Sequence, residues 1–83
     1  MTIRERIRYT RTIYQLTQLE VAKGLGVCKQ YITQIETNKK IASDERLEEI
    51  LNLVYVLGEN KKKGRLKDVL DDLKEQNDIE HER

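Results

Sequence analysis

The fold is decided by residues 16–36, which read LTQLEVAKGLGVCKQYITQIE. Thr17 precedes a helical pattern that has Glu20 at its third position, and this spacing is that of a capping box at the start of a helix. Gly26 follows the pattern, where glycine closes helices by taking a left-handed conformation. Cys28 begins a second pattern. The stretch therefore predicts two short helices, over residues 18–25 and from 28 to 36 or 37.

These two helices have the features of a tight helix-turn-helix. The small residue Ala22 stands where the helices cross, and Val27, Ile32 and Ile35 seat the second helix on a core. The remaining positions of the second helix point outward and are polar: Cys28, Lys29, Gln30, Thr33 and Gln34. A polar, uncharged-to-basic helix face of this kind suits the reading of base edges in a major groove.

The flanking sequence also favours helices, since it has no proline and the whole chain has only four glycines. A first helix is expected over residues 3–14. Ser43 caps a further helix, whose apolar stripe shows a 3.6-residue repeat and which Gly58 is expected to end. That stripe contains Leu47, Ile50, Leu51, Val54 and Leu57. The pattern predicts an all-α fold, a compact bundle of four to five helices.

The C-terminal third is expected to be a separate region. A polar linker is predicted over residues 59–64, then a last helix, then a polar and frayed tail from Glu75. We therefore expect a helix-turn-helix domain over residues 1–60 and an appendage over 61–83. The last helix carries a stripe of Leu66, Val69, Leu70 and Leu73. This stripe is either a dimer contact or part of the core, and the sequence leaves both open.

Charge is unevenly distributed along the 83 residues, although the net charge is only +1. Residues 1–41 contain eight Lys/Arg and three Asp/Glu, a net of +5, whereas residues 42–83 contain eight and twelve, a net of −4. A basic half beside an acidic half is expected when only one half meets a polyanion.

Several classes of function are disfavoured by the residue inventory. No apolar run reaches the ~18 residues of a membrane span, and a single cysteine, Cys28, forms no internal disulfide, so we expect a cytoplasmic protein with no membrane partner. One thiol and one histidine, His81, are too few for a metal site, and we expect no cofactor. The sequence has no glycine-rich phosphate loop and no paired carboxylates beside a plausible pocket, so an enzyme is not expected.

The central motif resembles the phage-repressor and Cro-like helix-turn-helix family, known as the XRE family. The resemblance lies in Leu-Thr-Gln at 16–18, Val-Ala at 21–22, Leu-Gly-Val at 25–27, Tyr-Ile at 31–32 and Ile-Glu at 35–36, and it covers roughly residues 7–43. It implies a lambda-repressor-like fold. The chain departs from the family pattern at five positions: Thr10, Gln15, Gly24, Cys28 and Asn38.

Site residues follow from the motif and the resemblance. We expect base reading by Lys29, Gln30, Thr33 and Gln34, with Lys29 equally able to contact a phosphate. Contacts to the DNA backbone are expected from Gln18, Cys28, Tyr31, Asn38, Lys39 and Lys40. The resemblance also implies a structural ion pair between Arg11 and Glu36.

The resemblance implies a sequence-specific transcriptional regulator, of the phage- or plasmid-repressor type, that binds a pseudo-palindromic operator in double-stranded DNA as a homodimer. Two alternatives remain open. One is an antitoxin that represses its own operon, and the other is a protein-interaction module that reads no bases. With no ligand pocket evident in the sequence, control is expected through the level of the protein or through a protein antagonist or toxin.

Overall fold

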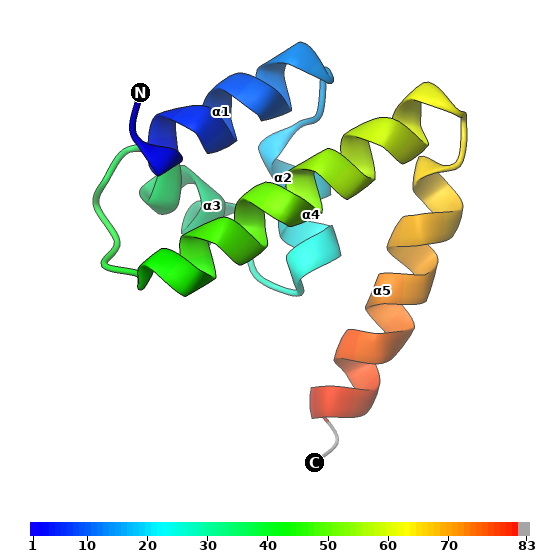
Figure 1. The fold of residues 1–83 in the computed structure, drawn as a ribbon. Coiled ribbons are helices and arrows are strands. Elements are labelled where there is room, and N and C mark those ends of the chain that lie inside the picture. The colour runs from blue at the N-terminus through cyan, green and yellow to red at the C-terminus, as the bar shows by residue number, and fades with distance from the viewer. Residues whose placement is uncertain (82–83) are drawn as a thin grey trace.

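The computed structural model describes residues 1–81, with side chains described for residues 1–74. These residues form five α-helices and no strand: α1 (Ile3–Ile13), α2 (Gln18–Leu25), α3 (Lys29–Glu36), α4 (Asp44–Lys62) and α5 (Leu66–His81). Figure 1 shows the long α4 crossing the molecule, α1 beside it, and α5 turning back from its end. The predicted all-α fold with a helix-turn-helix is confirmed.

The ends of the first helices are fixed by local hydrogen bonds. Thr17 and Glu20 form the predicted capping box of α2, and Thr2 and Glu5 form another at α1. Gly26 ends α2 with a φ of 79°, in the left-handed region that glycine adopts without steric cost. Ser43 accepts a hydrogen bond from the Arg46 amide and caps α4, as predicted. Local sequence therefore fixes both ends of α2 and the starts of α1 and α4.

Gly58 does not end α4, and this prediction was wrong. The helix continues to Lys62, and the linker expected over residues 59–64 is reduced to a short turn that Gly64 closes with a φ of 72°. Gly58 is buried beneath the ring of Tyr14, and a Cβ there would lie 2.2 Å from the Tyr14 Cγ. Glycine at position 58 thus serves packing between α1 and α4, and the sequence pattern gives no sign of it.

One apolar core joins all five helices. Its fully buried members include Ile7 of α1, Val21 of α2, Ile32 of α3 and Ile50 of α4. Gly24 lets α2 approach α4 closely, since a Cβ there would lie 3.0 Å from the Leu57 Cδ1. The close approach accounts for a glycine inside a helix, where it costs about 1 kcal/mol relative to alanine.

The last helix packs on the same domain. Its stripe of Leu66, Val69, Leu70 and Leu73 is partly buried against the core, and α5 contacts both α2 and α4. The stripe is therefore used as core, one of the two roles left open by the sequence. The helix also continues to His81, so the expectation of a frayed tail from Glu75 was wrong for residues 75–81; residues 82–83 lie outside the described residues. Within residues 1–81, no helix is long and apolar enough to cross a membrane.

Candidate nucleic-acid interface

The outer face of α3 is polar and accessible. Cys28, Lys29 and Gln30 are exposed at its N-terminal end, and Gln34 lies one turn further on, half-buried. Ile32 and Ile35 point the other way and are completely buried. Within the described residues, no side chain forms a hydrogen bond with the amide of Gln30 or Gln34. These two amides are thus available to an external partner.

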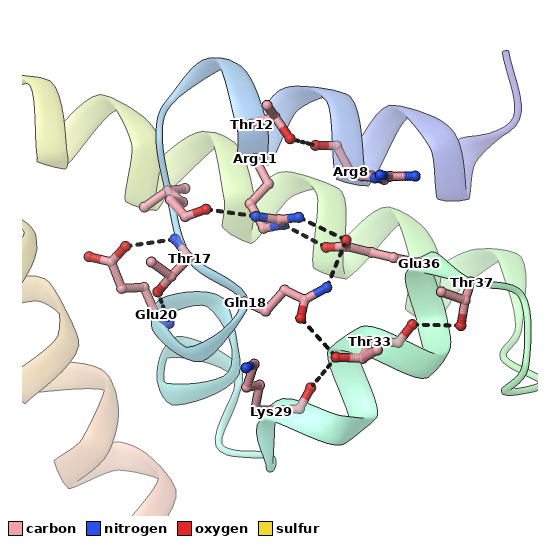
Figure 2. Close-up of polar contacts among 11 residues, drawn as sticks. Arg8, Arg11, Thr12, Thr17, Gln18, Glu20, Lys29, Thr33, Glu36 and Thr37 are labelled. Atoms are coloured by element: carbon pink, nitrogen blue, oxygen red, sulfur yellow. Dashed lines mark hydrogen bonds and ion pairs between the residues drawn. The ribbon is translucent and has the colours of Figure 1, made fainter.

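Thr33 and Gln18 lie against each other. The Thr33 hydroxyl donates to the Gln18 Oε1 over 2.8 Å, and the Gln18 Nε2 donates to the Glu36 Oε1 over 3.2 Å. Both ends of the Gln18 amide are therefore occupied within the protein (Figure 2). This arrangement makes Thr33 and Gln18 groups that fix α3 against α2, a role that the sequence did not indicate for either residue.

Arg11 and Glu36 form the pair that the family resemblance implied. The Arg11 Nε lies 2.7 Å from the Glu36 Oε2, and its Nη2 donates to Oε1 over 3.0 Å. The remaining Arg11 nitrogen, Nη1, donates to the backbone oxygen of Leu16. The side chains are 15% and 2% exposed, so the pair is largely removed from water. As Figure 2 shows, it ties the end of α3 to α1 and to the turn before α2.

The exposed side of α3 carries a positive charge, because the acidic residue of this helix is paired with Arg11. Glu36 is the one acidic residue within Lys29–Glu36, and its carboxylate is paired with the Arg11 guanidinium. Lys29 remains at the exposed start of the helix. A surface of this sign attracts a polyanion, and the uncharged amides beside it add hydrogen-bonding groups.

Cys28 occupies the N-cap of α3 but does not cap it. Its backbone has the extended conformation of a cap residue, yet its side chain makes no hydrogen bond to the helix amides. The thiol does not take the place of a Ser or Thr cap, because sulfur is a weak acceptor. Cys28 is exposed at the edge of the polar face.

Tyr31 is partly buried at the edge of the core, and two cations approach it. The Lys40 Nζ is 5.9 Å and the Arg46 guanidinium carbon 5.8 Å from its ring centroid. The Arg46 Nε also donates to the Tyr31 hydroxyl over 3.4 Å. This hydrogen bond raises the pKa of Arg46 above its ordinary value. Arg46 thus joins the basic edge of the surface. Because Arg46 lies on α4, outside the two motif helices, the sequence did not indicate its contact with Tyr31.

The loop after α3 is exposed and basic. Asn38 takes a left-handed conformation, with a φ of 60°, and this turns the chain away from α3. Lys39 and Lys40 follow on the surface, beyond the helix end. Arg4, which the sequence did not single out, donates from Nη1 to the Ile35 oxygen over 3.0 Å and closes the C-terminal turn of α3. The turn at Asn38 thus leaves Lys39 and Lys40 next to the C-terminal end of α3.

Comparison with known proteins identifies a helix-turn-helix over rather more than half of the chain. A family model described as helix-turn-helix, of the XRE type, matches residues 7–53. The match includes the two motif helices, the Arg11–Glu36 pair and Arg46, and ends within α4. No curated protein and no solved structure matches the chain.

Proposed function

The chain belongs to the XRE-type helix-turn-helix family of DNA-binding transcription regulators, and on this premise we propose that it is a repressor that binds a pseudo-palindromic operator as a dimer. In this proposal α3 lies in the major groove. Gln30 and Gln34 read base edges, Lys29 contacts a guanine or a phosphate, and Lys39 and Lys40 contact phosphates beyond the helix end.

The observation that carries the proposal is the accessibility of the Gln30 and Gln34 amides on a helix that is otherwise held rigidly. Adenine presents an acceptor and a donor at its major-groove edge, and a side-chain amide matches both. The ion pair of Arg11 with Glu36 and the Gln18–Thr33 contact fix α3 from the inner side. Readout of bases depends on such fixed positioning.

Two copies are proposed because one short helix contacts few base pairs. Helix-turn-helix dimers bind half-sites one helical turn apart, about 34–36 Å. The domain measures 33 × 32 × 20 Å, so two copies side by side match this spacing. A repressor of this size acts by occupying the operator.

The test is a mobility-shift titration at fixed salt. The duplexes are the region upstream of the chain's own coding sequence and a scrambled duplex of equal length. Tight binding to the upstream region, and at least 100-fold weaker binding to the scrambled one, is expected for an operator.

Two charge reversals provide the matched comparison. Lys29→Glu alters the exposed start of α3, whereas Lys67→Glu makes the same change on the exposed side of α5. Only Lys29→Glu should abolish the shift. A wild-type protein that binds neither duplex, or binds both equally, would contradict the proposal and favour a protein-interaction module.

A further inference from the structure

A groove of about 620 Å³ runs between the α2–α3 turn, the middle of α4 and the middle of α5. Its apolar lining comes from all three: Leu25 and Val27 at the turn, Leu53 and Val56 on α4, and Leu73 on α5. Val56 is 49% exposed although it stands in the middle of the longest helix. Apolar surface gathered from three elements is the usual composition of an interface centre.

The groove adjoins α3 without including its outer face. Val27 comes just before Cys28, the N-cap of α3, and Arg46 on the rim contacts Tyr31 of α3. Lys29, Gln30 and Gln34 do not line the groove. A partner seated there therefore leaves the outer face of α3 open.

The rim of the groove carries one charge of each sign. Arg46 and Glu49 lie one turn apart on α4, with the Arg46 Nη1 3.2 Å from the Glu49 Oε1. Their side chains are 33% and 61% exposed, so both retain capacity for further contacts. A surface that meets its own copy about a two-fold axis must be self-complementary. An adjacent Arg and Glu satisfy this condition, because the Arg of each copy can pair with the Glu of the other.

We propose that this groove is the contact between two copies of the chain, with Val56 at its centre and Glu49 of each copy facing Arg46 of the other. The inference rests on the proposed function in that it assigns the dimer contact of the operator complex. It also replaces the α5 stripe as the site of that contact, since only Leu73 of the stripe reaches the groove.

A second groove competes for this role and is less suited to it. It is lined by Tyr9, Ile13 and Tyr55, on the side of α1 away from Arg4 and Arg11, the residues that contact α3. At 100° per residue, Tyr9 and Ile13 lie on nearly the opposite side of α1 from those two arginines. Two copies joined there would hold their α3 helices on remote sides of the dimer.

The experiment measures self-association of the full chain by sedimentation equilibrium, with five proteins compared. The wild type should show a monomer–dimer equilibrium. Val56→Glu should weaken it at least tenfold, and Glu49→Arg should do so as well, because it sets an arginine against Arg46 of the second copy. Glu48→Arg makes the same charge change outside the groove, and Ile13→Glu changes the competing groove. Both controls should dimerise within about twofold of the wild type.

Binding to a single half-site separates this proposal from the proposed function. Val56→Glu should bind a half-site duplex like the wild type and lose cooperative binding to the full operator. A dimer that Val56→Glu and Glu49→Arg leave intact would overturn the assignment, as would a wild type that stays monomeric. A chain that dimerises through Val56 but binds no DNA would retain this inference and remove the proposed function.

Discussion

Arg11 and Glu36 meet in a two-pronged ion pair, with nitrogen–oxygen distances of 2.7 and 3.0 Å, that joins α1 to the last residue of α3. The Glu36 side chain is 2% exposed and also accepts from Gln18. The orientation of α3 therefore depends on a buried carboxylate whose partners come from two other helices.

Removing either member should be costly because the other charge is left buried. Arg11→Met or Glu36→Leu should each lower the free energy of unfolding by about 3–5 kcal/mol. Thermal and urea melts of both variants and of the double variant measure this. The double variant should be less destabilised than the sum of the two, and small additive losses would contradict a coupled buried pair.

Thr33→Val tests whether Thr33 positions α3 or reads a base. The valine removes the donor to the Gln18 Oε1, so we expect a loss of about 1 kcal/mol in unfolding free energy. Affinity for operator and for random DNA should fall by the same factor. Thr37→Val is the control, since the exposed Thr37 hydroxyl donates only to the Thr33 backbone oxygen. A reduced operator-to-random ratio with unchanged stability would make Thr33 a base reader.

Gly58→Ala tests the close packing of Tyr14 on α4. A methyl group 2.2 Å from the Tyr14 Cγ forces the ring to move, so overpacking should cost about 1–3 kcal/mol despite the better helix propensity of alanine. Urea denaturation provides the measurement. In a Tyr14→Ala background the same change should instead stabilise, by up to about 1 kcal/mol. Destabilisation in both backgrounds would show that the ring is not the cause.

Lys40 is expected to contact a phosphate and no base, whereas Lys29 is able to contact either. Lys40→Ala should weaken binding to operator and random DNA equally and reduce the slope of log affinity against log salt by about one. The exposed Lys67 on α5 supplies the control, since Lys67→Ala should leave the slope unchanged. The same titrations classify Lys29. A Lys40→Ala variant that loses affinity for the operator alone would be inconsistent with a phosphate contact.

The fold could be predicted from sequence where the determinants are local. The capping box of Thr17 and Glu20, the closing Gly26 and the cap Ser43 set helix boundaries through bonds within three or four residues, and the structure has them as expected. Gly58 was wrongly predicted to end α4, because the group that requires a glycine there, the ring of Tyr14, is 44 positions away in the sequence. Propensity alone cannot distinguish a glycine that ends a helix from one that accommodates a neighbour.

The candidate site was predictable to a similar extent. Helical spacing indicated which side of α3 faces outward, and the family resemblance implied the pair of Arg11 and Glu36. Neither gave the contact of Gln18 with Thr33 or the position of Arg46 beside Tyr31, since both depend on how two helices cross. Polar residues at an interface look alike in sequence whether they bind a partner or a neighbouring helix.

The central claim is that Gln30 and Gln34 read sequence, and the ratio of operator to random-DNA affinity tests it most directly. Titrations at one fixed salt concentration should compare the wild type with Gln30→Ala and Gln34→Ala. Each variant should lose about 1–3 kcal/mol on the operator and much less on random DNA, so that the ratio falls roughly 5- to 150-fold. A ratio that both variants leave unchanged would contradict the account, because base reading would then have to come from another face of the protein.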